Sequence, residues 1–371
     1  MRVAQVVGKM MGGGVEQVVM NYYRHIDRAR FQFDFLVDSD SPLVPREEIG
    51  ALGGRVFDIP PYQRQLAYQR ELCRLFRREG WPIVHSHINS LSVFPLRAAR
   101  RAGVPVRIAH SHSTSGRGEP LRNAAKALLR TQANRYPTQR LACSRYAGEW
   151  LFGRGSSFEV LPNAIELGQY SFDAAARAKL RAELGAGGST LVVGNVGRFM
   201  AQKNHAFLLE MFRGLLASRP DSLLILTGEG ELESEVRRNS VEMGLAERVH
   251  FLGRRDDVAA LYSAFDAFCL PSLYEGLPLV AIEAQRSGLP CLLSDTITRE
   301  ADVTGSVSFL PLSDTSAWVA GLSRLSSSAP SDRRAVSDAR LLAYDIEGAA
   351  RVLEGIYASA LCPQTRGEVS A

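Results

Sequence analysis

The alternation of short apolar runs with segments of helical spacing constrains the fold of this chain most. In the first half the apolar runs are Val3–Val7, Phe33–Val37, Ile83–His87, Val106–His110 and Leu141–Ser144; in the second they are Leu191–Val196, Ser222–Thr227, Val249–Leu252, Phe265–Leu270, Pro290–Ser294 and Val307–Leu310. Strands that alternate with helices form βαβ units and parallel sheets. Two such series predict an α/β protein made of two doubly wound, Rossmann-like domains.

The change from one series to the other lies between Pro162 and Ser189, where an Ala- and Arg-rich segment precedes a glycine-rich one. We therefore predict an N-terminal domain over residues 1–165 and a C-terminal domain over residues 166–345. A chain of 371 residues is long enough for two domains of ordinary size. The polar tail, residues 363–371, is expected to be disordered.

Composition indicates a globular protein of the cytoplasm. The chain is 46% hydrophobic and 22% charged, and it contains no run of about 18 apolar residues that would predict a membrane span. Its first residues are interpreted as a strand rather than a signal peptide. The five cysteines are odd in number and none forms a C-x-x-C pair, which favours buried thiols in a reducing compartment over disulfides or a zinc site.

Positive charge is concentrated in the front half. Residues 1–165 carry 24 Lys and Arg against 13 Asp and Glu, whereas the rest of the chain carries 20 against 26. Such a basic half suggests an anionic partner. The stretch Arg117–Arg140 interleaves six cations with leucines and alanines, which is typical either of a helix that lies on anionic lipid or of a solvated helix face. No nucleic-acid recognition motif accompanies the charge, so no nucleic-acid partner is expected.

Two acids, Glu275 and Glu283, lie eight positions apart after the apolar run that ends at Leu270. The first falls in a loop after a strand and the second inside the following helix. Parallel sheets bind ligands at this edge, where helix N-termini favour a phosphate. We expect the loop acid to hold sugar hydroxyls and the helix acid a ribose; a helix with two solvated acids is the alternative.

Glycine loops follow other predicted strands. Gly12–Gly14 follows the first strand, and Gly197 opens a loop that carries Arg198 and Lys203. Glycine lets backbone N–H groups approach a phosphate, and two cations at a strand end can neutralise a diphosphate. Gly228 ends a further strand and could line the same pocket. Plain turns and a solvated basic loop are the alternative interpretations.

Histidines and paired aspartates complete the set of candidates. His110 and His112 end a strand, where one or both rings could face a cleft or lie buried as structural histidines. Metal ligation there is not expected, because no Cys or carboxylate cluster lies nearby. The pair Asp38 and Asp40 has a metal-binding spacing, but Ser41 and Pro42 follow it, and we interpret it as a turn. We therefore predict no metal site.

Taken together, these segments resemble glycosyltransferase family 4, retaining enzymes of the GT-B type in which two Rossmann-like domains face each other across a cleft. The resemblance rests on Gly12–Glu16, His110–His112, Pro162–Ile165, Val196–Arg198 with Lys203, Gly228–Gly230 and Glu275–Glu283, in the family's order over nearly the whole chain. Within the family, the segment from Gly12 to Arg28 is most similar to transferases of bacterial exopolysaccharide and capsule assembly.

The resemblance implies roles for matching residues. Arg198 and Lys203 would hold the donor diphosphate, Glu275 would contact the donor sugar with help from the N–H groups of Gly276 and Leu277, Glu283 would bind the ribose, His112 would lie near the reacting carbon, and Gly13, Gly14, Gly197 and Gly228 would approach the donor or acceptor. The family's Asn-Gly-Ile-Asp is replaced by Asn163–Glu166, which weakens any role for Glu166. The helical pattern at 346–360 would be the family's C-terminal helix that crosses back to the first domain.

The sequence thus predicts a metal-independent retaining glycosyltransferase without a cofactor, with a UDP-sugar as the expected donor and a lipid-linked or saccharide acceptor. Its setting would be exopolysaccharide, capsule or cell-envelope polysaccharide biosynthesis, in the cytoplasm or on the inner face of the membrane. A UDP-sugar 2-epimerase on the same architecture and a non-catalytic saccharide-binding or partner subunit are the alternatives.

Overall fold

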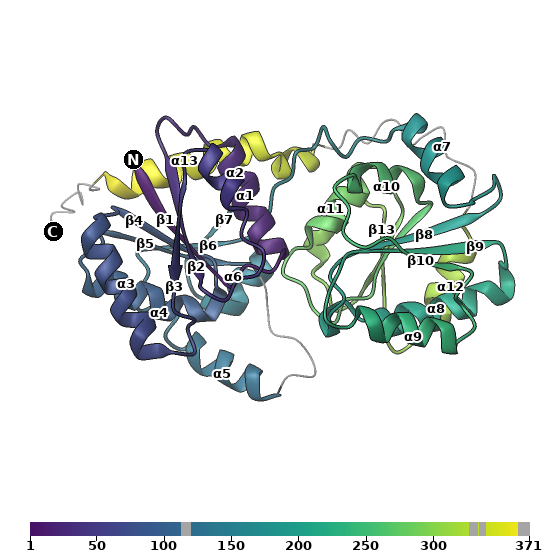
Figure 1. The fold of residues 1–371 in the computed structure, drawn as a ribbon, viewed down its shortest axis with the longest axis horizontal. Helices are drawn as coiled ribbons and strands as arrows, with labels where there is room; N and C mark the ends of the chain where they lie inside the picture. The colour runs from purple at the N-terminus through teal and green to yellow at the C-terminus, as the bar shows by residue number, and fades with distance from the viewer. Residues whose placement is uncertain (113–119, 326–332, 334–338, 363–371) are drawn as a thin grey trace. The chain divides into compact units, whose positions relative to one another are not determined.

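The computed structural model describes residues 1–112, 120–325, 333 and 339–362, and these form two compact units. The first unit comprises the described residues up to Ala164 together with those from Ile346 onward, and the second comprises those from Ile165 to Asp345. Each unit is a parallel sheet covered by helices (Figure 1). The predicted fold class, two α/β domains with parallel sheets, is confirmed.

The first unit contains a seven-stranded parallel sheet in the order β3-β2-β1-β4-β5-β6-β7. Its strands are β1 (Arg2–Gly8), β2 (Gln32–Asp38), β3 (Arg55–Ile59), β4 (Ile83–Ser86), β5 (Val106–Ser111), β6 (Gln139–Ala142) and β7 (Glu159–Val160). Its helices are α1 (Gly14–His25), α2 (Arg46–Ala51), α3 (Gln65–Glu79), η1 (Asn89–Ser92), α4 (Val93–Arg101), α5 (Pro120–Arg130), α6 (Arg145–Phe152) and α13 (Ile346–Leu361).

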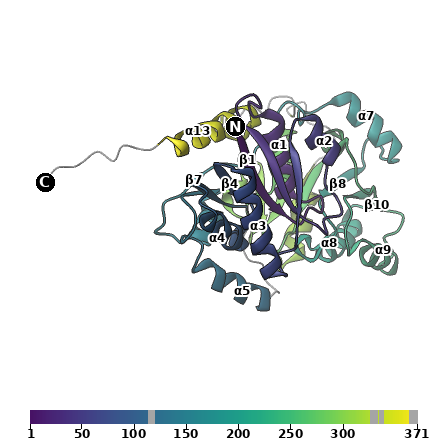
Figure 2. The same cartoon turned by 60° about the vertical axis from the view of Figure 1, so that its left-hand side comes forward.

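The two faces of this sheet differ because successive side chains of a strand point to opposite sides. On β1, Ala4 and Val6 join an apolar core with residues of α3 and α4, whereas Gln5 bonds Tyr357 of α13 on the other face. Helix α13 packs beside α1, as both views show (Figures 1 and 2). The C-terminal helix of the chain therefore belongs to the first unit and covers a polar strip of its sheet.

The second unit contains a six-stranded parallel sheet in the order β10-β9-β8-β11-β12-β13. Its strands are β8 (Leu191–Val196), β9 (Ser222–Thr227), β10 (Val249–Phe251), β11 (Ala267–Leu270), β12 (Cys291–Ser294) and β13 (Val307–Leu310). Its helices are α7 (Ala174–Glu183), η2 (Ala201–Lys203), α8 (His205–Ser218), α9 (Glu233–Glu242), α10 (Val258–Ala264), α11 (Leu279–Arg286), η3 (Arg299–Ala301), α12 (Thr315–Ser323) and η5 (Leu341–Tyr344).

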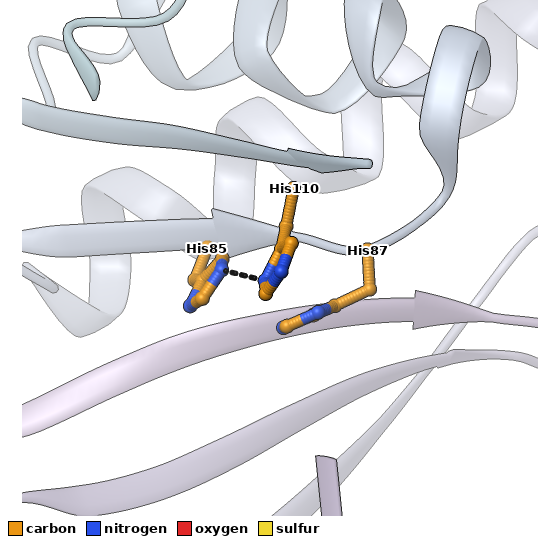
Figure 3. Close-up of side chains that lie close together, drawn as sticks. All are labelled: His85, His87 and His110. Carbon is orange, nitrogen blue, oxygen red and sulfur yellow. Dashed lines mark hydrogen bonds between the residues drawn. The ribbon is translucent and has the colours of Figure 1, made fainter. Parts of the chain in front are cut away.

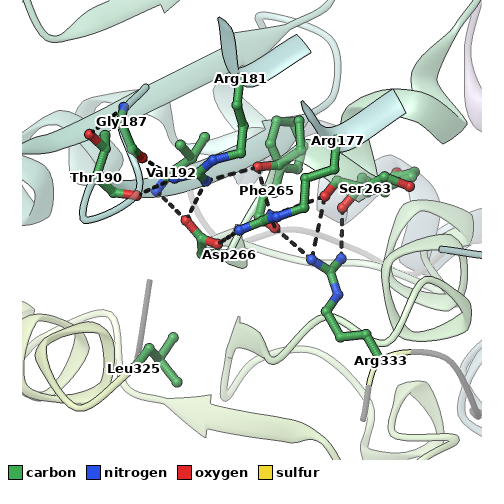
Figure 4. Close-up of polar contacts among 12 residues, drawn as sticks. Arg177, Arg181, Gly187, Thr190, Val192, Ser263, Phe265, Asp266, Leu325 and Arg333 are labelled. Atoms are coloured by element: carbon green, nitrogen blue, oxygen red, sulfur yellow. Dashed lines mark hydrogen bonds and ion pairs between the residues drawn. The ribbon is translucent and has the colours of Figure 1, made fainter. Parts of the chain in front are cut away.

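A buried arginine cluster fixes α7 against the end of α10 (Figure 4). Arg177 donates to the carbonyls of Ser263 and Phe265, and Arg181 bonds Asp266 at 2.8 Å. Arg333 donates to the Phe265 carbonyl as well. The last carbonyls of a helix have no partner within it, so these guanidinium groups satisfy the end of α10 and hold the segment that leads into β11.

Most of the predicted strands are present, and their ends lie within two residues of the predicted ends. The sequence did not predict two strands, β3 and β7, and both lie at edges of the first sheet. Edge strands are partly exposed and need no continuous apolar run, as the intermediate or exposed burial of most of β3 shows. Among the described residues, no helix is long and apolar enough to cross a membrane.

Candidate active site

The second sheet has a topological switch point between β8 and β11. From β8 the chain runs outward through β9 and β10 on one side, and through β11, β12 and β13 on the other. In open α/β sheets, ligands bind outside the carboxyl ends of the strands at such a point. Arg198 and Lys203 follow β8, and Glu275 follows β11, so the order of strands brings these loops to one edge.

Lys203 and Glu275 form a largely buried ion pair. Lys203 Nζ lies 2.7 Å from Glu275 Oε1, and the two side chains are 15% and 11% exposed. Gln202 ties the same loops together, because its carbonyl accepts from the Leu273 N–H at 2.8 Å and its side-chain amide donates to the Tyr274 carbonyl at 2.8 Å. The structure thus joins two residues 72 positions apart that the sequence could only place in the same kind of loop.

Glycines bring these loops into close contact. A Cβ at Gly197 would lie 3.3 Å from Lys203 Cε, so the lysine stem lies directly over the backbone there. Gly228, after β9, has φ +138°, and a Cβ on it would come 2.2 Å from the Gly197 carbonyl oxygen. Backbone cannot give way as a flexible side chain can, so only glycine fits at position 228. A direct contact of either glycine with a donor stays a prediction.

Arg198 is held more loosely than Lys203. Its guanidinium lies 3.6 Å from the carboxylate of Glu231, and the two side chains are 26% and 58% exposed. Such partly solvated pairs contribute little to stability, so an anionic ligand can replace the carboxylate at small cost. The role of Arg198 toward a diphosphate stays a prediction.

Glu283 lies inside α11 and is buried against aromatic hydroxyls. Tyr262 donates its hydroxyl to Glu283 Oε2 at 2.8 Å. Burial raises the pKa of Glu283 to about 7, and hydrogen bonds from Tyr262 and Tyr170 act against this rise. The predicted partners Gly276 and Leu277 are buried in the turn before α11. Tyr262 lies on α10 and belongs to no sequence motif, so its contact with Glu283 could not be predicted.

In the first unit, the side chain of Glu16 bonds backbone N–H groups of the glycine loop after β1. Glu16 accepts from the backbone N–H groups of Met11 and Gly13, both at 2.8 Å. Gly14 begins α1, and a Cβ there would meet nothing within 4 Å. The predicted contact of Gly13 with a phosphate or an acceptor would therefore compete with the Glu16 carboxylate, whereas the space at Gly14 is open.

His112 follows β5 and is buried. The side-chain oxygen of Asn89 accepts a hydrogen bond from the backbone N–H of His112 at 2.7 Å. Ring nitrogen Nδ1 of His112 lies 3.3 Å from Asn163 Oδ1. Burial lowers its pKa to about 4, so the ring is neutral at pH 7. A neutral ring here can exchange hydrogen bonds with a substrate but cannot supply a positive charge.

Sequence reasoning missed two further histidines beside it. His85 and His87, at and just after the end of β4, contact His110 and His112, at and just after the end of β5. Figure 3 shows three of these rings, His85, His87 and His110. The sequence could have indicated them, because His-x-His occurs at the ends of both strands. Period-2 spacing puts the two rings of each motif on one face of the sheet.

The basic stretch Arg117–Arg140 is divided among several elements. Within its described part, α5 ends at Arg130, a turn follows, and β6 begins at Gln139. Arg130 stacks over the Trp150 ring with 4.6 Å between the guanidinium carbon and the ring centre. Leu128 on α5 is 72% exposed. Residues 113–119, which include Arg117, lie outside the described residues.

The aspartate pair at Asp38 and Asp40 lies at a turn, as predicted from the residues that follow it. Asp40 forms an ion pair with Lys9, with 2.6 Å between the carboxylate and the amine. Burial, with a smaller effect of Asp40, raises the pKa of Asp38 to about 6.

Family models match both halves of the chain. Residues 13–164 match the model described as a glycosyl transferase 4-like domain, and residues 190–328 match the model described as glycosyl transferases group 1. Together they cover well over half of the sequence.

Individual relatives agree with these matches. The chain is 36% identical over 368 residues to the glycosyltransferase EpsF of Bacillus subtilis (strain 168), with 96% of each chain covered. It is 28% identical over 312 residues, 79% of each chain, to UDP-Gal:alpha-D-GlcNAc-diphosphoundecaprenol alpha-1,3-galactosyltransferase of Escherichia coli. Its fold is similar to that of Anabaena HepE in complex with UDP-glucose, with a TM-score of 0.75 at 19% identity over 96% of this chain and 99% of that chain.

Proposed function

Since this chain belongs to glycosyltransferase family 4 and has the GT-B fold, we propose that it is a retaining enzyme that transfers a sugar from a UDP-sugar to a lipid-linked or saccharide acceptor. The observation that carries the proposal is the Lys203–Glu275 pair at the switch point of the second sheet. The names of relatives support the donor and the setting: one uses UDP-galactose and an undecaprenol-linked acceptor, and a structural neighbour holds UDP-glucose. Exopolysaccharide, capsule or cell-envelope polysaccharide biosynthesis is the setting that we infer.

The second unit supplies what departure of a nucleoside diphosphate requires. Negative charge grows on the phosphates as the glycosidic bond breaks, and fixed cations stabilise that charge. Lys203 is held in place by Glu275, and Arg198 can exchange its weak partner for a phosphate. These two side chains can provide the stabilisation without a metal ion.

The remaining roles follow from polarity and burial. Glu275 accepts hydrogen bonds from hydroxyls of the donor sugar while it holds Lys203. Glu283 binds the ribose from its place on α11, where Tyr262 orients its carboxylate. His112 offers a neutral ring to a hydroxyl near the reacting carbon, and the acceptor attacks from the face that the diphosphate leaves.

The test is transfer of radiolabelled sugar from UDP-glucose, UDP-galactose or UDP-N-acetylglucosamine to lipid extract that contains polyprenyl-diphosphate saccharides. We expect one donor to label the lipid fraction, and Glu275→Ala to reduce the rate by about 10²-fold or more. Glu242→Ala is the matched control, because Glu242 is a 66% exposed acid of the same unit. Equal rates in wild type and Glu275→Ala would remove the residue from the site.

The epimerase alternative makes a separate prediction. Such an enzyme would convert a UDP-N-acetylhexosamine to its 2-epimer without any acceptor. Incubation of the protein with UDP-N-acetylglucosamine alone, followed by NMR of the sugar, distinguishes it from a transferase. We expect no epimer.

Contact with anionic membrane is the less direct part of the proposal. Leu128 projects from α5 among basic residues, an arrangement that suits an interfacial helix. In co-sedimentation with phosphatidylglycerol vesicles at low salt, Leu128→Glu should bind less than wild type. Leu66→Glu is the control, since Leu66 is 76% exposed on α3 of the same unit. Binding unchanged by Leu128→Glu would exclude α5.

A further inference from the structure

Four histidines gather between the sheet of the first unit and α13. His85 lies at the end of β4 and His110 at the end of β5, while His87 and His112 lie just after these strands. All four are at most 5% exposed. Figure 3 shows His85, His87 and His110 turned toward one another. One nitrogen from each of these three lies within 4.8 Å of the others.

Oxygen atoms lie beside the outer nitrogens of three of the four rings. His85 Nδ1 lies 2.7 Å from the Tyr357 hydroxyl, and His87 Nε2 lies 2.8 Å from Gln5 Oε1. The outer nitrogen of His112 faces Asn163 Oδ1 at 3.3 Å. A carbonyl oxygen can only accept, so the nitrogens of His87 and His112 that face Gln5 and Asn163 carry the proton.

The inner nitrogens of His87 and His112 then face each other without a proton. A neutral imidazole holds a single proton, and in His87 and His112 that proton is already placed on the outer side. Yet His87 Nδ1 lies 2.9 Å from His112 Nε2. Two lone pairs at such a distance repel unless a cation lies beside them. His85 Nε2 and His110 Nδ1, 3.1 Å apart beside this pair, can share one proton.

We propose that His85, His87 and His110 bind a late first-row transition-metal ion such as Zn²⁺. Imidazole nitrogen favours zinc, copper and nickel over calcium and magnesium. Histidines that bind metals commonly donate their other N–H to an oxygen, as Gln5 accepts from His87 here and as Tyr357 can accept from His85. The proposal rests on no step of the transfer reaction.

The geometry requires a modest adjustment. Zinc binds histidine nitrogen at about 2.0–2.1 Å, which places tetrahedral ligands about 3.4 Å apart. His85 and His110 are already close to this separation, whereas the widest pair of the three, at most 4.8 Å apart, must close by up to about 1.4 Å through rotation of a ring. Three neutral ligands leave a fourth position for water or hydroxide, and ionisation of that water lowers the buried charge.

A different orientation of two amides gives the competing account. If Gln5 and Asn163 present their NH₂ groups to the rings, the inner nitrogens can receive protons and the cluster becomes a chain of ordinary hydrogen bonds. In that case the histidines bind no metal, and the experiment below distinguishes the two accounts.

The test uses the full chain without a polyhistidine tag, stripped by a chelator and titrated with Co²⁺ and Zn²⁺. We expect one ion per chain, with the visible absorption of tetrahedral Co²⁺ that Zn²⁺ then displaces. His85→Gln and His110→Gln should each bind at least tenfold more weakly. His250→Gln is the matched control, because His250 lies on β10 of the other unit. No bound ion in wild type, or binding by His85→Gln and His110→Gln as tight as that of wild type, would overturn the proposal.

X-ray absorption on zinc-loaded wild type tests the proposal even if the variants fail to fold. The expected first shell contains three imidazole nitrogens at about 2.0–2.1 Å. Sulfur in that shell would place the ion at one of the free cysteines, such as exposed Cys362, and would contradict the histidine site.

Discussion

Both units carry polar side chains where the strands of their parallel sheets end, but these side chains differ in charge. In the second, an ion pair between Lys203 and Glu275 lies at the switch point. In the first, the ends of β4 and β5 carry four histidines whose pKa values are lowered by burial and which are therefore neutral at pH 7. A fixed cation suits a ligand that gains negative charge, and neutral rings suit hydroxyl groups or a metal ion. The same fold thus supports different chemistry through a few residues at strand ends.

Glycine loops give the largest expected difference between the units. Gly228→Ala should lower the free energy of unfolding by about 4 kcal/mol or more, because its Cβ would meet the Gly197 carbonyl at 2.2 Å. Gly14→Ala should change it by less than about 0.5 kcal/mol, since that Cβ has open space at a helix start. Denaturant unfolding measures both; equal effects would contradict the contrast between a closed and an open loop.

A buried acid in the second unit predicts a loss of stability as pH rises. The folded pKa of Glu283, about 7, lies above its usual value of 4.5, so the folded state retains a proton that the unfolded state has released. The free energy of unfolding should therefore fall between pH 4.5 and 7, by about 3 kcal/mol relative to Glu283→Gln. If the free energies of unfolding of wild type and Glu283→Gln changed in parallel with pH, the Glu283 carboxylate would not be desolvated.

Two buried tyrosines, one in each unit, allow a further comparison of how stability depends on pH. Tyr262→Phe removes a donor to Glu283, and Tyr357→Phe removes the hydroxyl that bonds His85 and Gln5. Each should cost about 2 kcal/mol of unfolding free energy near pH 7. The cost of Tyr262→Phe should grow above pH 7, as Glu283 ionises, whereas that of Tyr357→Phe should not. Urea unfolding at pH 6 and pH 8.5 separates them, and identical pH responses would contradict this account.

The sequence predicted the architecture well because apolar runs and glycine turns are local signals. The strands β8 to β13 were all recognisable, whereas β3 and β7 were not, since edge strands need less apolar character. It placed Glu275 and Lys203 in loops at strand ends, but their 2.7 Å contact depends on the order of strands in the sheet, which no local pattern encodes.

Partners from distant elements were the hardest to predict. Tyr262 reaches Glu283 from α10, and Tyr357 reaches His85 from the end of the chain, 272 residues away. His85 and His87 were assigned only to a strand, although the repeated His-x-His spacing predicts that their rings share a face. Such contacts arise from packing between helices and a sheet, so they require the fold itself.

Binding of UDP to wild type, Lys203→Ala and Lys179→Ala tests the central claim most directly. Lys179 is 78% exposed on α7 of the same unit and serves as the matched control. Isothermal titration should show UDP bound at least tenfold more weakly by Lys203→Ala, a difference of about 1.4 kcal/mol, and with unchanged affinity by Lys179→Ala. Equal affinity in all three proteins would contradict the assignment of the donor site to the edge that Lys203 and Glu275 share.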